Sequence, residues 1–246
     1  MITLSAWLLV VGLCDLLRAT QDTISPRHRW VLVALGLSLL LFVGVWLDLP
    51  VRGWTTVGIT WVVGLVGWLV CSSAALDPSS GHRPRWRALA FTAVVVPGVL
   101  LALLGDAVPV SVGLPELVDD SLLGRAGPEA GLLLGGALLA QISTANVAVR
   151  LLLDAVGVPA VSNEKLLKGG RALGPMERIF IIGLGLAGSL GAAAVVVAAK
   201  ALLRYPELQR TEREEGPTDV SEYFLIGSFS SWLLALAGLG VFVLGR

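Results

Sequence analysis

The chain has 246 residues, of which 55% are hydrophobic and only 15% are charged, and its mean hydropathy is +0.82. A soluble domain carries about 25% charged residues, so low charge combined with long apolar stretches indicates a membrane protein. Eighteen Lys and Arg balance eighteen Asp and Glu, so the net charge gives no sign of a nucleic-acid partner.

Seven apolar stretches follow one another along the chain. A membrane-spanning helix needs about 20 mostly apolar residues, and six stretches qualify: residues 30–47, 54–70, 88–104, 130–149, 179–199 and 223–244. Residues 2–17 form a shorter stretch interrupted by Asp15, and we interpret it as a retained first helix because no basic residue precedes it, as a signal peptide would require. The predicted fold is all-α, a polytopic membrane helix bundle with about seven transmembrane helices.

The expected organisation is a single integral membrane domain over residues 1–246. It consists of an N-terminal four-helix part (1–105), an acidic outer loop (106–129) and a C-terminal three-helix part (130–246). With the N-terminus outside, twelve of the eighteen Lys and Arg lie on the inner side, which favours an N-out/C-in orientation. The four basic residues of the loop 200–222 fit this orientation poorly. If the first helix only lies on the membrane surface, six helices remain and the N-terminus is inside.

Richness in Ala, Val, Gly, Leu and Arg is typical of a GC-rich bacterial gene, so we expect a multi-pass protein of the bacterial inner membrane. Cys14 and Cys71 fall at inner helix ends, where a reducing cytoplasm predicts no disulfide. Together with His28 and His82 they lack the spacing of zinc ligands, so no metal site is predicted.

Tryptophan and proline mark two of the early helices. Trp54, Trp61 and Trp68 recur every seven residues and form one stripe. We expect Trp54 and Trp68 to anchor the helix at the two membrane interfaces and Trp61 to pack against a neighbouring helix. Pro97 lies in the middle of its helix and predicts a bend, with a gate as the alternative.

Polar side chains gather in the fifth stretch, which reads "AQISTANVAVR" over residues 140–150. Polar groups inside a membrane suggest function. One interpretation is a polar pathway for a small solute or ion; the other is hydrogen bonding between helices, worth about 0.6–2 kcal/mol for each bond. We favour the second, because no acid or base lies at the centre of the bilayer. The candidate pathway residues are Gln141, Ser143, Thr144 and Asn146.

The sixth stretch contains GLGLAG, a literal G-x-G-x-x-G over residues 183–188. A dinucleotide site needs a strand before this motif and a helix opening at it. Here the motif lies inside an apolar stretch, where backbone in hydrocarbon must be helical, so no nucleotide is expected. Small residues four apart instead predict close helix packing, with the fifth helix as a partner. The residues of this predicted packing surface are Gly183, Gly185, Ala187, Ser189 and Gly191.

Charged residues lie at helix ends rather than mid-membrane. Glu222 is expected near Lys200 or Arg204, in an ion pair that clamps the last two helices; the alternative is that these side chains extend into the head groups. Glu177 and Lys200 are expected on opposite faces of the membrane. Residues 158–175 predict a short interfacial segment attracted to anionic lipid. The candidate helix-end charge set is Glu177, Arg178, Lys200, Arg204 and Glu222.

Three motifs in the last third of the chain resemble a known family. They read "GGRALGPMERIFIIGLGL", "AAKALLRYPEL" and "EYFLIGSFSS". Residues 165–245 resemble the C-terminal block of an uncharacterised bacterial multi-pass membrane protein family, and the N-terminal half is not matched. The resemblance implies no activity, but it implies that the helix-end charges act as a set. The matching positions are Gly170, Arg171, Gly174, Glu177, Arg178, Lys200, Arg204, Glu207, Leu208, Glu222, Tyr223, Gly227 and Ser231.

The sequence favours a structural, assembly or accessory role in the membrane. The alternatives are a transporter or channel with a pathway near residues 141–146 and an enzyme at the membrane interface. The enzyme is the least favoured, because H-E-x-x-H, G-x-S-x-G and paired intramembrane aspartates do not occur. No catalytic residue or cofactor is predicted. The expected partners are the lipid bilayer, anionic lipid at the inner leaflet, and a protein partner or second copy, with no nucleic acid or nucleotide.

Overall fold

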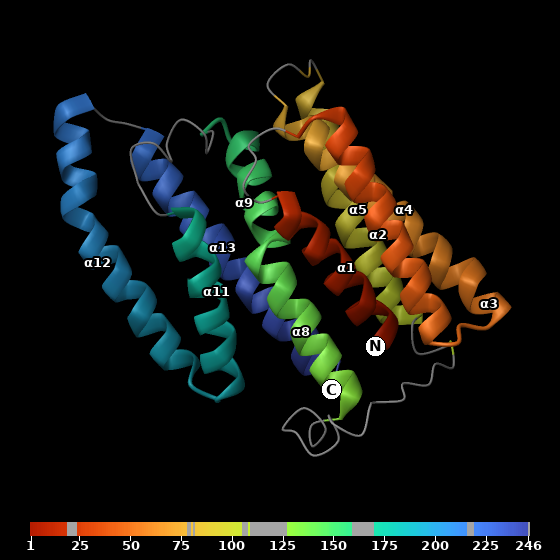
Figure 1. Ribbon diagram of the computed structural model, residues 1–246. Coiled ribbons are helices and arrows are strands. Elements are labelled where there is room, and N and C mark those ends of the chain that lie inside the picture. The colour runs from red at the N-terminus through yellow and green to blue at the C-terminus, as the bar shows by residue number, and fades with distance from the viewer. Residues whose placement is uncertain are drawn as a thin grey trace. The chain divides into compact units, whose positions relative to one another are not determined.

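The computed structural model describes residues 1–18, 24–77, 80, 82–104, 108, 127–158, 170–215 and 219–245. All the regular structure in these ranges is helical (Figure 1). The elements are α1 (Ile2–Arg18), α2 (Pro26–Trp46), α3 (Val51–Gly53), η1 (Trp54–Gly58), α4 (Ile59–Leu76), α5 (Arg83–Leu104), α8 (Pro128–Ile142), α9 (Thr144–Ala155), α11 (Gly170–Leu186), α12 (Leu190–Glu215) and α13 (Asp219–Leu244). The acidic loop 106–129, apart from its last three residues and residue 108, and most of the segment 158–175 lie outside the described residues.

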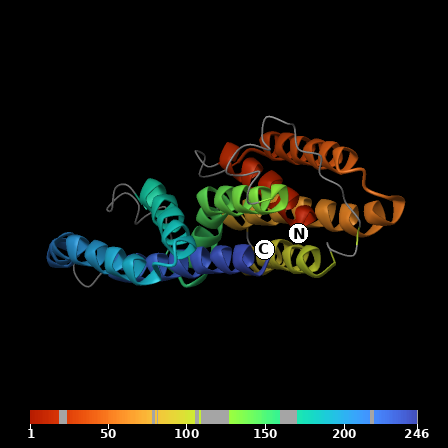
Figure 2. The same cartoon turned by 90° about the horizontal axis from the view of Figure 1, so that it is seen from below.

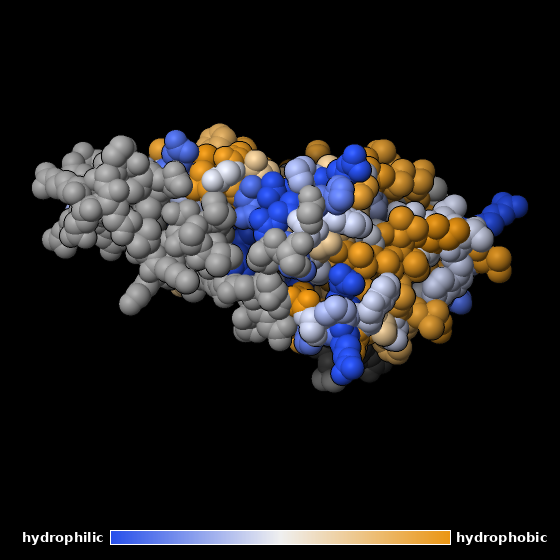
Figure 3. Space-filling model, turned by 90° about the horizontal axis from the view of Figure 1, so that it is seen from above, coloured by the Kyte–Doolittle hydropathy of each residue, from blue (hydrophilic) through white to orange (hydrophobic). Residues whose placement is uncertain are grey.

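Five helical stretches of the described chain are long and apolar enough to cross a membrane. They are Pro26–Trp46, Val51–Leu76, Arg83–Leu104, Glu129–Ala155 and Ser221–Leu244. Large apolar side chains point outward from them: Phe42 is 68% exposed and Leu103 is 72% exposed. Figure 3 shows apolar side chains interspersed with hydrophilic ones over the coloured part of the face in view. Exposed apolar side chains on long helices suit a hydrocarbon surrounding, so the all-α membrane class is confirmed, while the count of seven is not.

The chain divides into two compact units. Unit 1 comprises residues 1–144 and 241–246, and unit 2 comprises residues 145–240. The division falls between α8 and α9 and near the end of α13. It therefore groups α8 with the N-terminal helices, whereas the sequence grouping placed it in the C-terminal part.

Helix α1 lies at the centre of unit 1, where it packs against α2, α5 and α8. All six residues from Ile2 to Trp7 are buried, and six consecutive residues point to every side of a helix. Burial around the whole circumference is typical of a core helix rather than an interfacial one. The structure therefore favours a first helix inside the bundle over the alternative in which it only lies on the membrane surface.

Close contacts show that α1 runs parallel to α8. A Cβ added at Gly136 would lie 2.8 Å from the carbonyl oxygen of Ser5, and seven residues further along both helices the Ser143 hydroxyl donates to the carbonyl oxygen of Gly12. The small residues of α8 therefore allow α1 to approach, in place of the predicted partner at 179–199.

The pair α4 and α5 is also closely packed. A Cβ added at Gly64 would lie 2.8 Å from the ring of Pro97, which is buried inside α5. Trp7 of α1 lies 3.1 Å from the same position. Pro97 thus contributes a rigid packing surface to unit 1.

The predicted continuous helix over residues 179–199 is wrong. Helix α11 ends at Leu186 and α12 begins at Leu190, so the chain reverses direction between them (Figures 1 and 2). Gly188 has φ +73°, a left-handed conformation that glycine adopts without the steric cost of a Cβ. The amides of Gly188 and Ser189 donate to the carbonyls of Gly185 and Leu184, which is the Schellman pattern of a helix end. The predicted single helix is therefore two helices, α11 and α12, which pack together around a core of Ile181, Ala193 and Ala235.

The two ends of the chain meet in unit 1. A Cβ added at Gly245 would lie 2.6 Å from the side chain of Leu133 and 3.3 Å from that of Met1. The end of α13 therefore lies beside the beginnings of α1 and α8. The expected N-out/C-in orientation puts the two termini on opposite sides of the membrane, whereas the two ends of the described chain lie together in unit 1.

Candidate functional site

The most polar buried site of unit 2 surrounds Arg178. Its guanidinium is on α11 and is only 1% exposed. Nη1 donates to Ser231 Oγ on α13 at 2.8 Å, and Nη2 donates to Asn146 Oδ1 on α9 at 2.5 Å. One side chain thereby connects three helices. A Cβ added at Gly174, one turn earlier on α11, would lie 3.4 Å from Nη1, so a small residue leaves room for the guanidinium.

The buried guanidinium remains a cation at neutral pH. Burial lowers the pKa of Arg178 to about 10, because desolvation disfavours the charged form, and the neighbouring Glu177 carboxylate partly offsets this effect. A buried charge is tolerated only when hydrogen bonds replace its hydration. The amide of Asn146 and the hydroxyl of Ser231 supply such bonds, and they fix the orientation of the planar group.

The neighbouring Glu177 forms an ion pair with Lys200. Lys200 Nζ lies 2.5 Å from Glu177 Oε1, and the two side chains are 23% and 16% exposed. Lys200 Nζ also lies 5.6 Å from the ring centroid of Phe224 on α13, within the range of a cation–π contact. The expectation that Glu177 and Lys200 lie on opposite faces of the membrane is wrong, because the turn at Gly188 brings α12 back along α11.

The remaining members of the helix-end charge set are placed differently. Lys200 takes Glu177 as its carboxylate partner, whereas the Glu222 side chain is exposed, so the predicted Lys200–Glu222 clamp is not formed. The side chain of Arg204 lies outside the described part of the chain. We call Arg178, Asn146, Ser231, Glu177 and Lys200 the Arg178 cluster.

The candidate pathway residues of α8 and α9 are buried or half-buried. The Ser143 hydroxyl donates to the carbonyl oxygen of Gly12 on α1 at 2.7 Å and to that of Leu139 at 2.8 Å. Asn146 accepts a hydrogen bond from Arg178, as described above. Gln141 and Thr144 are 7% and 8% exposed. Two of the four polar groups therefore bind another helix of their own unit, as the hydrogen-bonding interpretation predicts.

A second polar cluster lies at the end of α1 in unit 1. Arg18 Nε donates to Asp15 Oδ1 at 2.7 Å, and the indole Nε1 of Trp68 donates to Asp15 Oδ2 at 2.8 Å. The Arg18 guanidinium lies 5.7 Å from the centroid of the Trp68 ring and donates to Ser73 Oγ at 3.2 Å. Asp15 and Trp68 are fully buried. Oδ2 of Asp15 holds α1 against α4 through Trp68, and Oδ1 orients Arg18, which reaches Ser73 of α4.

Two tryptophans of the stripe, Trp61 and Trp68, consequently face α1. The Nε1 of Trp61 donates to the carbonyl oxygen of Thr3 at 3.0 Å, and its side chain is 1% exposed, which confirms that Trp61 packs against a neighbouring helix. The expectation that Trp68 anchors the helix at a membrane interface is wrong, because its indole donor is used by Asp15. Trp54 is half-buried and packs against Gly44 and Gly58.

The predicted packing surface at 183–191 is divided between two helices. At Gly185 an added Cβ would overlap the side chain of Leu239 on α13. Around Gly183 and Gly191 no atom lies within 4 Å of an added Cβ, and Gly188 forms the turn, with Ala187 and Ser189 on either side of it. Close approach is therefore a property of Gly185 alone among these glycines. The motif GLGLAG follows a helix and not a strand, so no dinucleotide-binding turn is formed.

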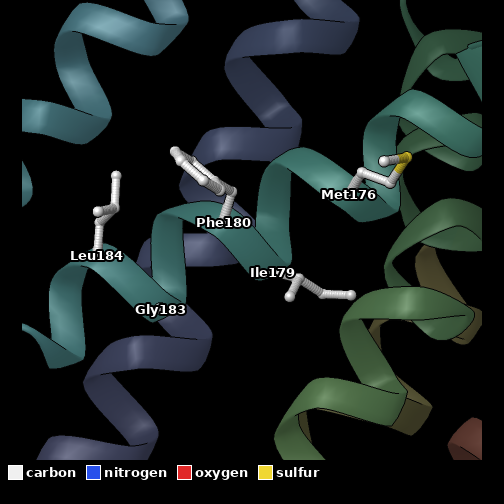
Figure 4. A pocket seen from close by; sticks show the side chains of 5 residues that line it. All are labelled: Met176, Ile179, Phe180, Gly183 and Leu184. Atoms are coloured by element: carbon white, nitrogen blue, oxygen red, sulfur yellow. The ribbon is translucent and has the colours of Figure 1, made fainter.

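An apolar hollow of about 430 Å³ runs along α11 and is lined by Met176, Ile179, Phe180, Gly183 and Leu184 (Figure 4). Spacings of three and four residues place all five on one face of the helix. Since none of them carries a charge or a hydrogen-bonding side chain, the hollow suits hydrocarbon rather than a polar solute.

No protein-family model, curated protein or solved structure matches the chain. The class of the protein therefore rests on the fold, which is helical and has, among the described residues, five helices long and apolar enough to cross a membrane.

Sequence reasoning missed the partners of the polar groups more often than the groups themselves. The link between Arg178 and Ser231 joins residues 53 positions apart, and no local spacing indicates it. The link between Asp15 and Trp68 is equally remote in sequence. The second link did have a signal in the sequence. Asp15 is an acid inside an apolar stretch and Trp68 carries an indole donor, and both groups need a partner when they are buried.

Proposed function

We propose that the protein is an integral membrane component with a structural, assembly or accessory role, and that its buried polar residues join its own helices rather than conduct a solute. The observation that carries this proposal is the Arg178 guanidinium, which is buried and hydrogen-bonded to Asn146 and Ser231. Ser143, the other well-bonded member of the predicted pathway, is used in the same way by α1.

The proposal is tested by comparing stability with flux. We expect Ser143→Ala and Asn146→Leu each to lower the free energy of unfolding by about 1–3 kcal/mol, because each removes a buried hydrogen bond. Thermal unfolding in detergent measures this loss. Ser38→Ala is the control, since that exposed hydroxyl donates to Ala34 of its own helix and should change stability little.

Flux through proteoliposomes supplies the second measurement. Proton flux is followed with trapped pyranine and glycerol flux by light scattering. If the protein has an accessory role, we expect the proton flux and the glycerol flux to equal those of protein-free vesicles. Flux above that background, abolished by Asn146→Leu while the thermal midpoint stays unchanged, would instead assign these residues to a pathway.

Transport is a second candidate function because the sixth apolar stretch is interrupted. Many transporters place such discontinuous helices beside their substrate sites, and the break at Gly188 is of this kind. A transport role predicts that Gly188→Ala and Asn146→Leu both reduce flux in the same vesicles.

We place the protein in the inner membrane of a bacterium, with its N-terminus outside. The excess of Lys and Arg in the segments that follow α1 and α4 supports this orientation. The basic segment between α9 and α11, most of it outside the described residues, fits anionic lipid at the inner leaflet. Co-purification of one protein, or of a second copy, at constant stoichiometry would support the accessory role.

Membership of the uncharacterised bacterial membrane family remains part of this proposal. The positions that carry the resemblance are spread over more than 60 residues, yet several of them lie within the Arg178 cluster. Gly174 approaches Arg178, Arg178 binds Ser231, and Glu177 pairs with Lys200. Their association supports the inference that these residues act as one set.

A further inference from the structure

We propose that α11 and α12 form a re-entrant hairpin that enters the bilayer from the side on which α13 begins and returns to that side, so that the chain crosses the bilayer six times and both termini lie on the side opposite the hairpin's entry. This inference requires the membrane location proposed above, but it does not require the accessory role.

Neither arm of the hairpin is long enough to cross the bilayer. The apolar part of α11 begins after Arg178 and ends with the helix at Leu186, and that of α12 runs over Leu190–Leu203 with Lys200 inside it. A crossing helix needs about 20 apolar residues. The contacts of the hairpin with α13 at Phe224 and Leu239 are fifteen residues apart, roughly 22 Å at 1.5 Å per residue, so the hairpin reaches past the middle of a hydrocarbon core of about 30 Å.

The contacts with α13 place the open end of the hairpin. Lys200 lies over Phe224 near the beginning of α13, and Gly185 meets Leu239 near its end. Helix α11 therefore runs parallel to α13, and α12 returns to the side on which α13 begins. The chain then makes its last crossing through α13, which spans Ser221–Leu244.

The helix directions in unit 1 give the same count. Because α1 and α8 are parallel, an even number of bilayer crossings must separate the beginning of α1 from the beginning of α8. Four crossings are available between these points: α1, α2, the segment from α3 to α4, and α5. The stretch α8 to α9 and helix α13 add two more. The contact of Gly245 with Met1 and Leu133 requires the C-terminus to return to the starting side, as six crossings do.

The distribution of basic residues agrees with this topology better than with a continuous sixth helix. A continuous helix leaves twelve Lys and Arg on one side and six on the other. The hairpin returns the segment after Lys200 to the basic side, so that only three basic residues remain opposite: Arg52, Arg125 and Arg246. Fifteen of eighteen then lie on one side, and the positive-inside rule assigns that side to the cytoplasm.

The outer surface of the hairpin suits lipid chains. Met176 is 65% exposed, Phe180 is 48% exposed and Val195 is 68% exposed. The apolar hollow along α11 belongs to the same surface (Figure 4). Phe180 and Val195 lie between the Glu177–Lys200 pair and the turn, and Met176 comes directly before the pair.

Single-cysteine labelling tests the topology in the full-length chain. In a Cys14→Ala, Cys71→Ala background, four variants are compared: Ser111→Cys, Ser162→Cys, Glu222→Cys and Arg246→Cys. A membrane-impermeant maleimide is applied to intact cells and to permeabilised cells. We expect Ser111→Cys and Arg246→Cys to react in intact cells, and Ser162→Cys and Glu222→Cys to react only after permeabilisation.

Which variants react together distinguishes the hairpin from a continuous sixth helix. With a continuous sixth helix, Glu222→Cys reacts in intact cells together with Ser111→Cys, and Arg246→Cys requires permeabilisation; that result overturns the hairpin. Equal reactivity of Ser111→Cys and Ser162→Cys overturns the membrane location itself. A protease-cleavable tag after Arg246, in a chain that keeps both cysteines, repeats the measurement without core substitutions, and cleavage in intact cells is the result we expect.

Discussion

At the scale of single residues, neighbouring glycines have different roles that the sequence does not distinguish. Gly135 and Gly136 are adjacent on α8. A Cβ added at Gly136 would lie 2.8 Å from the backbone oxygen of Ser5 and 3.2 Å from Cβ of Leu8, whereas nothing lies within 4 Å of one added at Gly135. The first position allows α1 to approach, and the second does not contribute to this contact.

We therefore expect Gly136→Ala to destabilise the protein by about 1–3 kcal/mol, the usual effect of inserting a methyl group into a closely packed contact. Gly135→Ala should be neutral, or stabilising by up to about 1 kcal/mol through its better helix propensity. Thermal unfolding of the two variants in the same detergent measures the difference. Equal stability of both would show that α1 does not approach α8 at Gly136.

Buried polar residues form the second feature at this scale. Arg178 and Asp15 are ionisable groups inside apolar packing, and each makes at least two hydrogen bonds or ion-pair contacts within its own unit. Removing one partner of such a group leaves a buried charge without its hydrogen bond, which is costly. These residues therefore determine which helices meet more than they add to the net stability.

At the scale of elements, the break between α11 and α12 depends on the conformation of Gly188. Its φ of +73° is accessible to glycine but strained for alanine by roughly 1–2 kcal/mol. We expect Gly188→Ala to destabilise the hairpin by about that amount, measured by thermal unfolding.

The control is Gly191→Ala, a position inside α12 with nothing within 4 Å of an added Cβ. It should be neutral or slightly stabilising. If residues 179–199 formed one continuous helix, both substitutions would replace a helical glycine and both would stabilise. The sign of the effect at Gly188 therefore distinguishes the two structures.

At the scale of the whole molecule, the end of α13 belongs to unit 1 although most of the helix belongs to unit 2. Phe242 is 5% exposed, and Gly245 meets Leu133 and Met1. Deleting residues 241–246 should lower the free energy of unfolding by at least about 1.5–3 kcal/mol, the contribution of burying one large apolar side chain.

Deletion of Arg246 alone serves as the control, because it leaves Phe242 and Gly245 in place. Thermal unfolding of the two shortened chains and the full chain provides the comparison. A full-length thermal midpoint for the chain that ends at residue 240 would contradict the contact between the two ends of the sequence.

Much of the fold could be predicted from the distribution of apolar residues along the chain. The stretches at 54–70, 88–104, 130–149 and 223–244 fall within helical segments that can cross a membrane, and the stretch at 30–47 extends one residue beyond such a helix. Hydropathy predicts these helices because the backbone of an apolar segment in hydrocarbon can satisfy its hydrogen bonds only by forming a helix. The same reasoning failed at 179–199, because apolar composition does not report a glycine with positive φ, and the fragments on either side are as apolar as a continuous helix.

The sequence by itself determined that this protein is helical, apolar and built to lie in a membrane, since these properties follow from composition and from local periodicity. It also drew attention to polar and charged residues within or beside the apolar stretches, among them Gln141, Ser143, Asn146, Glu177, Arg178 and Lys200. Only the tertiary structure decided their partners. Ser143 meets Gly12, Arg178 meets Asn146 and Ser231, and Glu177 meets Lys200. These pairings join residues far apart in the chain, and the packing of whole helices, together with one reversal at Gly188, brings them within hydrogen-bonding distance.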